Sequence, residues 1–162
     1  MDSSGNHLKV DISLMTPDDA KETTDKSWQT SWESEYLSRD EFLKYSFKCN
    51  EELIALAAYE VFRRHLVVHI VYMEAHPESN PTFRKNTKKY FGIGKLLIAY
   101  GIKLSVDYGL GGDVVLEAKT SELEKHYVSD FGAVKLPIHT ASAPRYLIAN
   151  DAAKNIFFSY LE

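Results

Sequence analysis

The sequence predicts a single domain of the α/β (α+β) class, spanning residues 1–162, and three patterns support this prediction. Residues 45–75 alternate apolar and polar side chains in runs separated by short polar turns, which is typical of antiparallel hairpins. After Gly92 the apolar side chains recur with the period of an α-helix. Beyond that helix, short strand and helix patterns follow one another along the chain. A chain of this length can bury a sizeable core.

The composition is that of an ordinary globular protein, and it narrows the classes of function. Hydrophobic residues make up 44% of the chain and charged residues 26%, with a net charge of −4 at pH 7. This acidic balance disfavours a general nucleic-acid binder and mildly favours cationic substrates. The single cysteine, Cys49, excludes an internal disulfide framework. No signal-peptide pattern or membrane-length apolar run is present, so we expect a cytoplasmic protein with no membrane partner.

The N-terminal third is expected to hold one strand and two helices. Residues 8–15 alternate apolar and polar side chains, as a half-buried strand does. Residues 16–19 (Thr-Pro-Asp-Asp) are typical of a helix start, with a capping hydroxyl, an early proline and acids in the first turn. Residues 38–41 have the spacing of a capping box, so a second helix is expected there. Trp28 and Trp32 are four residues apart and could share a helical face.

The middle of the chain is expected to form a three-stranded meander. Its strands are residues 45–49, 53–62 and 65–75, which are rich in valine, isoleucine and tyrosine. Polar turns at residues 50–51 and 63–64 join them. The remaining elements are expected in the order helix 92–109, strand 113–118, helix 121–131, strand pair 134–136 and 145–148, and helix 150–161. The helix at residues 121–131 is expected to begin with a capping box at Ser121 and to end at Gly132.

Two glycines, Gly92 and Gly94, stand where a basic polar stretch becomes the long helix. Glycine at a helix start exposes backbone N–H groups that have no partner inside the helix. Together with the helix dipole these groups form an anion site, for which phosphate is the usual guest. The pattern is neither a Walker loop nor the dinucleotide fingerprint, because Leu97 stands where a third glycine would be. By itself, the pair of glycines equally fits a plain tight loop.

In this element order, the segment Lys89-Tyr90-Phe91-Gly92-Ile93-Gly94 resembles the signature Arg/Gln-x-x-Gly-x-Gly/Ala of the GNAT superfamily of acyl-CoA-dependent N-acyltransferases. Lys89 takes the Arg/Gln place, and the resemblance covers roughly residues 45–136. It implies a GNAT fold, with a single central, mixed, mostly antiparallel twisted sheet flanked by helices. It also implies acetyl-CoA as co-substrate, with its pyrophosphate held by the residues Lys89, Tyr90, Phe91, Gly92, Ile93, Gly94 and Lys95.

A second match to the family lies in the helix expected at residues 121–131. Tyr127 takes the place of a tyrosine that, in the family, protonates the leaving thiolate of coenzyme A. Thr120 stands where an asparagine that contacts the cofactor is frequent. The spacing from Tyr127 to Gly132 is one residue longer than the spacing common in the family. The loop between Pro77 and Gly92 is also longer than the usual short turn. At this helical spacing Tyr127 also fits an ordinary core position.

His69 and Glu74 are both candidates for the general base that removes the proton from the acceptor amine. Strand alternation puts His69, Met73 and Ala75 on one face and Glu74 on the other. A histidine titrates near neutral pH, and an acid inside an apolar strand is costly unless it is paired or used. Both also fit purely structural roles. The resemblance implies that backbone amides near residues 73–75 hold the thioester carbonyl.

We therefore expect an N-acetyltransferase that acts on a primary amine of a small molecule or peptide. A non-catalytic acyl-CoA-binding or sensing domain is one alternative. An acetyltransferase acting on aminoacyl-tRNA, with basic residues 84–89 as the contact patch, is another, although nucleic acid is disfavoured by the net charge. No metal site is expected, because the six histidines show no helical His-x-x-x-His pair. Association of two copies through the aromatic C-terminal helix stays open.

Overall fold

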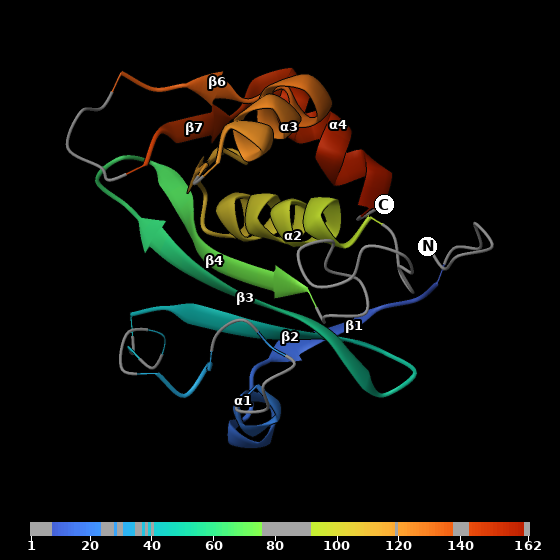
Figure 1. The fold of residues 1–162 in the computed structure, drawn as a ribbon. Coiled ribbons are helices and arrows are strands. Elements are labelled where there is room, and N and C mark those ends of the chain that lie inside the picture. Colours follow the sequence, from blue (N-terminus) through green and yellow to red (C-terminus); the bar gives the residue numbers. More distant parts are fainter. Residues whose placement is uncertain are drawn as a thin grey trace. The chain divides into compact units, whose positions relative to one another are not determined.

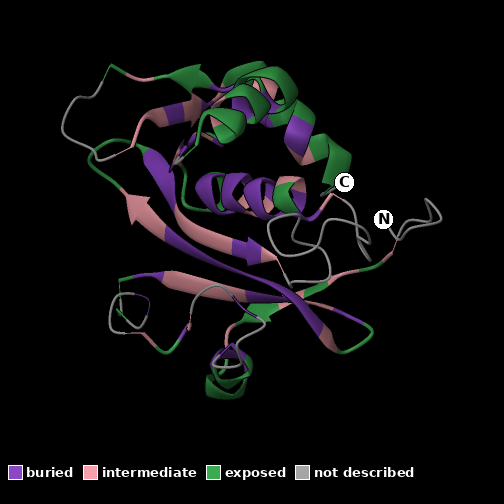
Figure 2. Cartoon of the chain, viewed as in Figure 1, coloured by how far each residue is buried: buried purple, intermediate pink, exposed green. Residues whose placement is uncertain are grey.

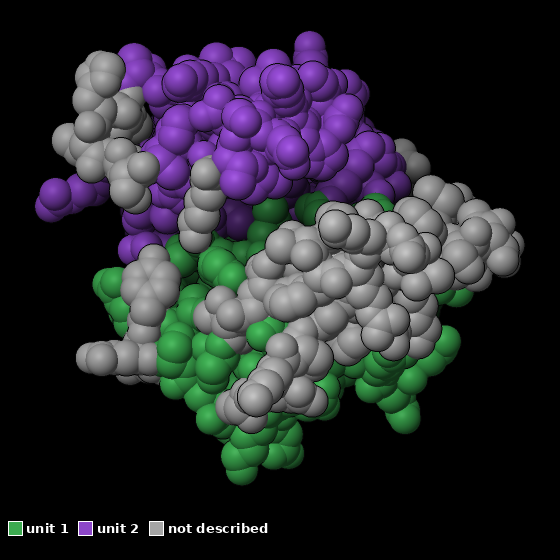
Figure 3. Space-filling model, viewed as in Figure 1, with its two compact units in different colours: residues 1–59, 71–94 green, residues 60–70, 95–162 purple. Residues whose placement is uncertain are grey.

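A computed structural model describes residues 8–23, 28, 31–34, 37, 39, 41–75, 92–118, 120–137 and 143–160. The chain divides into two compact units (Figure 3). Unit 1 consists of Met1–Tyr59 with Val71–Gly94, and unit 2 of Glu60–Ile70 with Lys95–Glu162. The expectation of one domain stays a prediction.

Within the described ranges, seven strands form one sheet in the order β1-β2-β3-β4-β5-β7-β6 (Figure 1). The elements along the chain are β1 (Asp11–Leu14), α1 (Pro17–Glu22), β2 (Leu43–Cys49), β3 (Glu52–Phe62), β4 (Val67–Ala75), α2 (Ile93–Asp107), β5 (Val114–Glu117), α3 (Ser121–Phe131), β6 (Val134–Lys135), β7 (Arg145–Ile148) and α4 (Asn150–Tyr160). Strands β4 and β5 are parallel, whereas β1–β2, β2–β3, β5–β7 and β6–β7 pair antiparallel. The predicted mixed, mostly antiparallel sheet flanked by helices is confirmed.

Helix α1 of unit 1 begins as the sequence predicts. The Thr16 hydroxyl accepts the backbone N–H of Asp19 over 3.2 Å, and the Asp19 carboxylate accepts the N–H of Thr16 over 3.0 Å. This reciprocal pair is a capping box, and Pro17 takes the first helical position. The helix is therefore closed at its start by side chains of its own segment.

Asp19 also ties α1 to strand β2. Its carboxylate accepts the Ser46 hydroxyl over 2.7 Å and lies 2.8 Å from the Lys48 ammonium, although Asp19 is only 3% exposed. Burial raises the pKa of Asp19, but hydrogen bonds from Lys48, Thr16 and Ser46 outweigh it and lower the pKa to about 2. The ionised form of Asp19 is thus part of the folded state.

Replacing this carboxylate should destabilise the protein in a pH-dependent way. A pKa lowered from 3.8 to about 2 corresponds to about 2 kcal/mol of stability that is complete above pH ~4. This contribution is lost as the pH falls from about 4 through about 2, because the unfolded chain takes up the proton at a higher pH than the folded chain does. We expect Asp19→Asn to lower the free energy of unfolding at pH 7 by about 2 kcal/mol in urea titrations. The deficit should shrink towards pH 2.

Asp18→Asn is the matched control, because Asp18 is the exposed neighbour in the same helical turn. It should change the free energy of unfolding by no more than about 0.5 kcal/mol. Equal destabilisation by the two substitutions at pH 7 would show that the contacts of Asp19 with β2 do not anchor the helix.

The core of unit 1 includes an aromatic cluster from the segment between α1 and β2. Trp28, Trp32, Leu37 and Phe42 are buried together with residues of β3. The backbone N–H of Trp32 donates to the Thr23 hydroxyl over 2.7 Å. The two tryptophans therefore share a core, but residues 31–34 form a turn, so the predicted shared helical face is wrong.

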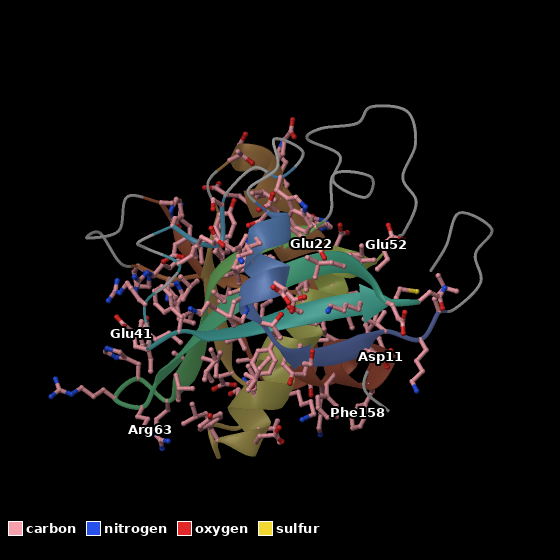
Figure 4. The ribbon with its side chains drawn as sticks, turned by 90° about the horizontal axis from the view of Figure 1, so that it is seen from below. Asp11, Glu22, Glu41, Glu52, Arg63 and Phe158 are labelled. Atoms are coloured by element: carbon pink, nitrogen blue, oxygen red, sulfur yellow. The ribbon has the colours of Figure 1, made fainter. Side chains whose placement is uncertain are left out.

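The helix predicted from Ser38 is also wrong where the structure describes it. Glu41 and Phe42 lie in a turn, and strand β2 begins directly afterwards, with Leu43 opposite Tyr59 of β3. Glu41, labelled in Figure 4, forms an ion pair with Arg39, so its carboxylate is engaged there. Pairing with β3 outweighs the local capping signal. Ser38 and Asp40 lie outside the described residues.

Unit 2 contains the C-terminal part of the sheet and helices α3 and α4. Buried residues gather on α2 and on β5, as Figure 2 shows for the helix. The N-cap of α3 is Thr120, whose hydroxyl accepts the N–H of Leu123 over 3.1 Å. The capping box predicted at Ser121 is therefore wrong, because the helix is capped one residue earlier and Leu123 has no side-chain acceptor to return the bond. Gly132 ends the helix at φ +67°, as predicted.

Strand β4 starts at Val67 rather than at residue 65, because residues 63–66 form a turn. Among the described helices, none is long and apolar enough to cross a membrane.

Candidate active site

Three polar side chains from three strands meet within unit 2. Glu117, the last residue of β5, lies directly opposite Arg145, the first residue of β7. His69 of β4 lies opposite Val115, two residues before Glu117. Because side chains two apart in a strand share a face, this register puts His69, Glu117 and Arg145 on one face of the sheet.

Each carboxylate oxygen of Glu117 has its own partner. Nε2 of His69 lies 2.9 Å from Oε2, and Nε of Arg145 donates to Oε1 over 3.1 Å. The side chains of His69, Glu117 and Arg145 are 10%, 20% and 30% exposed. The cluster is therefore mostly removed from water but open at its Arg145 end.

The two partners keep the carboxylate of Glu117 ionised. Burial is the largest single influence and raises the pKa of Glu117, but the hydrogen bond and charge of His69 and the charge of Arg145 together lower it below its ordinary value. At neutral pH the side chain is consequently a hydrogen-bond acceptor only.

The ring of His69 is held by packing as well as by Glu117. It stacks on Phe62 of β3 with ring centroids 5.2 Å apart and an interplanar angle of 26°. The residue is 8% exposed, and within the described part of the chain its Nδ1 atom is buried with no hydrogen-bond partner. A buried polar atom without a partner costs free energy, so it deserves a functional explanation.

Tyr127 lies on α3 in the same unit. Its ring is 5% exposed and packs against Phe131 and Tyr146, with centroids 6.2 Å and 6.4 Å away. Burial, followed by the negative charge of Glu117, raises the pKa of Tyr127 to about 12. The hydroxyl therefore keeps its proton throughout the physiological range and can donate it.

The first turn of α2 is open on the side of Gly94. Gly92 adopts φ +80°, a conformation that side-chain-bearing residues rarely take, and the helix begins at Ile93. Among the described residues, a Cβ atom built at Gly94 would meet nothing within 4 Å. The ammonium of Lys95 lies 5.7 Å from the ring centroid of Tyr160 on α4. The backbone at Gly94 thus has room for close approach by a ligand, whereas Lys95 faces an aromatic ring.

Thr120 lies in unit 2 as the N-cap of α3, and the remaining predicted site residues fall in unit 1 or outside the described residues. Glu74 is buried, and its carboxylate accepts the indole N–H of Trp32 over 3.3 Å, so it does not face solvent. Trp32 in turn meets Tyr72 edge to face, with centroids 5.7 Å apart. Met73 and Ala75 are half-buried. Lys89, Tyr90, Phe91 and the basic patch at residues 84–89 lie outside the described residues.

The structure therefore links His69 and Tyr127 through a residue that the sequence analysis missed. Glu117 hydrogen-bonds to His69 and acts on the pKa of Tyr127. An acid at the end of an apolar strand, the argument applied to Glu74, could have identified it. Nothing in the sequence marks Arg145, which lies 28 residues further along. No group of three or more metal-ligating side chains occurs among the residues described.

No family model matches this sequence, and no curated protein matches it. Solved structures do match. PaiA N-acetyltransferase from Thermoplasma acidophilum, in complex with coenzyme A, has a TM-score of 0.61 and 13% identity, covering 88% of this chain and 100% of that one. Ribosomal-protein-S18-alanine N-acetyltransferase from Escherichia coli has a TM-score of 0.58 and 13% identity, covering 88% and 96%. An uncharacterized protein from Bacillus halodurans has a TM-score of 0.65 and 10% identity, covering 94% and 90%.

These likenesses define the class of fold. The chain has the GNAT fold, as the resemblance in its sequence implied. At 10–13% identity the likeness extends to the fold alone.

Proposed function

We propose that the protein is an acetyl-CoA-dependent N-acetyltransferase that acts on a primary amine of a small molecule or peptide. The observation that carries this proposal is the contact between His69 and the carboxylate of Glu117 in unit 2, together with a buried tyrosine, Tyr127, whose pKa is raised by burial and in part by the charge of Glu117. Such a set contains both a proton donor and a proton acceptor, which acyl transfer to an amine requires. The GNAT fold, in which a similar structure binds coenzyme A, supports the same conclusion.

The residues at the start of α2 fit the pyrophosphate of coenzyme A. Backbone N–H groups of residues 92–95, with the predicted residues 89–91, would hold it, and the open space at Gly94 allows close contact. The proposal also retains Thr120 as a cofactor contact and the backbone amides of residues 73–75 as donors to the thioester carbonyl. Coenzyme A supplies the acetyl group as an activated thioester.

Two side chains of unit 2 handle the protons. Water carries a proton from the acceptor nitrogen to His69, and the electron pair left on nitrogen forms the new bond to the acetyl carbon. Tyr127 donates its hydroxyl proton to sulfur as the carbon–sulfur bond breaks, and it recovers the proton from solvent. Glu74, the other candidate base, accepts a hydrogen bond from Trp32 inside the core of unit 1. The proposal accordingly gives the base role to His69.

A thiol-release screen tests the proposal. The full chain is mixed with acetyl-CoA and a panel of amines comprising polyamines, amino acids and peptides with free N-termini or lysines, and free thiol is followed over time. We expect steady release with at least one amine above the rate without amine. Saturable acetyl-CoA binding by calorimetry with no release for any amine would instead favour an acyl-CoA-sensing domain. Absence of both binding and release would contradict the two functions together.

A further inference from the structure

Arg145 is held in place by its main chain and by one of its side-chain nitrogens. The N–H of Ala118 donates to the carbonyl oxygen of Pro144, the residue before it, over 3.0 Å. The N–H of Leu136 donates to the carbonyl oxygen of Arg145 itself over 2.8 Å. The Nε atom of Arg145 donates to Oε1 of Glu117 over 3.1 Å. The side chain is thus ordered before any ligand binds, which lowers the entropy cost of binding.

The outer edge of this guanidinium is available to a ligand. Within the described part of the chain, the Arg145 side chain donates through Nε, and its two terminal amino groups have no acceptor. The side chain is 30% exposed, more than that of Glu117 or His69 in the same cluster. A guanidinium always carries its positive charge, and its N–H groups form a rigid fork. An anion that arrives from solvent can therefore reach a preformed donor here.

A carboxylate fits this donor better than a phosphate does. A guanidinium and a carboxylate are both planar, so two parallel hydrogen bonds can join them. The ionised Glu117 already places one negative charge against the same guanidinium. Its repulsion of a singly charged carboxylate is about half its repulsion of a doubly charged phosphate. The arrangement consequently favours a ligand with a single negative charge.

We propose that Arg145 binds a carboxylate group of the acceptor, so that the substrate is an amino acid rather than a polyamine or another amine without an acidic group. This inference rests on the proposed function and names the substrate class of the same site. Glu117 hydrogen-bonds to both Arg145 and His69, so the carboxylate site and the proposed base belong to one cluster. An acceptor bound there has its amine and its carboxylate close together, as a free amino acid has.

The local charge at Arg145 differs from that of the whole chain. The net charge of −4 by itself favours cationic ligands. In this cluster, however, both oxygens of Glu117 have partners, one in His69 and one in Arg145, and the carboxylate is only 20% exposed. The most exposed charge of the three is the guanidinium. A ligand carboxylate finds a donor there, whereas a second ammonium group would be repelled.

The first test compares substrates of the wild type and needs no variant. Thiol release from acetyl-CoA is measured with the common amino acids and with their amides, in which an uncharged group replaces the carboxylate. A hydrogen bond to a charged group contributes enough free energy for an effect of about 10–100-fold. We expect the best amino acid to exceed its amide in kcat/KM by this factor, chiefly through KM. An amide that is accepted as well as its amino acid would overturn the proposal.

The second test asks whether Arg145 makes this distinction. Arg145→Gln should lower kcat/KM for the best amino acid by about 10–100-fold and leave the value for its amide within about threefold. His69→Gln should instead lower kcat for both acceptors alike, because the proposed base serves every acceptor. Equal losses for the two acceptors in Arg145→Gln would overturn the proposal, since Arg145 would then act through Glu117 alone.

Lys135→Gln is the matched control for the loss of a positive charge in the same strand pair. Lys135 of β6 is exposed and lies opposite Tyr146, the neighbour of Arg145 in β7. Because successive side chains of a strand alternate between faces, Lys135 lies on the face opposite to Arg145. Its replacement should leave the preference for the amino acid over its amide unchanged.

Binding without turnover separates this inference from the proposed function. Each amino acid is titrated by calorimetry into the full chain in the presence of coenzyme A, which carries no acetyl group to transfer. We expect saturable binding that Arg145→Gln weakens and Lys135→Gln does not. Such binding without thiol release for any amine would contradict the proposed acetyl transfer and support the carboxylate site. Thiol release without any dependence of binding on Arg145 would contradict the carboxylate site alone, and absence of both would contradict both.

Discussion

Tyr127→Phe should lower kcat for acyl transfer by about 100-fold or more while acetyl-CoA still binds with nearly unchanged affinity. Proton donation by a positioned side chain contributes roughly 10²–10⁴-fold to a rate, and the substitution removes only the hydroxyl. The ring packing against Phe131 and Tyr146 is retained by phenylalanine, so the fold should persist. Steady-state thiol release and calorimetric binding of acetyl-CoA measure the two quantities.

The pH profile of the wild type provides a further check on Tyr127. Because burial and the charge of Glu117 raise its pKa to about 12, the hydroxyl is still protonated at pH 10. We therefore expect no loss of activity between pH 8 and pH 10 from ionisation of Tyr127. Tyr108→Phe, an exposed change at the end of α2, is the matched control and should leave kcat unaltered. Wild-type turnover in Tyr127→Phe would remove the general-acid role.

Gly94→Leu should weaken acetyl-CoA binding by about 100-fold, which corresponds to ~2.7 kcal/mol, without unfolding the protein. A Cβ atom at this position would meet no atom of the described part of the chain within 4 Å, so a side chain can be accepted there. Leucine also favours a helix more than glycine by roughly 0.5–1 kcal/mol, so the melting temperature should stay constant or rise. The proposed pyrophosphate, however, needs the space that the leucine side chain would fill. Affinity and stability should therefore change in opposite directions.

A leucine in the equivalent helical position elsewhere is the control for this experiment. Asp151 is exposed and is the second residue of α4, as Gly94 is the second residue of α2. Asp151→Leu should leave the affinity for acetyl-CoA within about twofold of the wild type, a difference of under 0.5 kcal/mol. An unchanged affinity in Gly94→Leu would show that coenzyme A binds elsewhere.

Local patterns predicted most of the elements correctly, because each element has its own periodicity and its own end signals. Gly132 ends α3 in the left-handed conformation that glycine accepts readily, and Thr16 with Asp19 closes the start of α1. The predictions failed where a capping pattern competed with tertiary structure. At Glu41 the acid pairs with Arg39 and the chain enters β2, because pairing with β3 satisfies many backbone groups at once.

The candidate site shows the same division between local and long-range information. The sequence pointed to His69 and Tyr127, and through its resemblance to a family it also assigned the role of Tyr127. It placed Gly92 and Gly94 at a helix start, which the structure confirms for α2. The roles proposed for these residues remain predictions that the variants above can test.

The sequence by itself determined most of the strands and helices and the glycine-containing start of α2. Only the tertiary structure decided that Glu117 joins His69 to Arg145. These residues are 48 and 28 positions apart, and the parallel pairing of β4 with β5 and the antiparallel pairing of β5 with β7 bring them together. Register between distant strands depends on the packing of the whole sheet, and a shift by one residue would turn Glu117 to the opposite face.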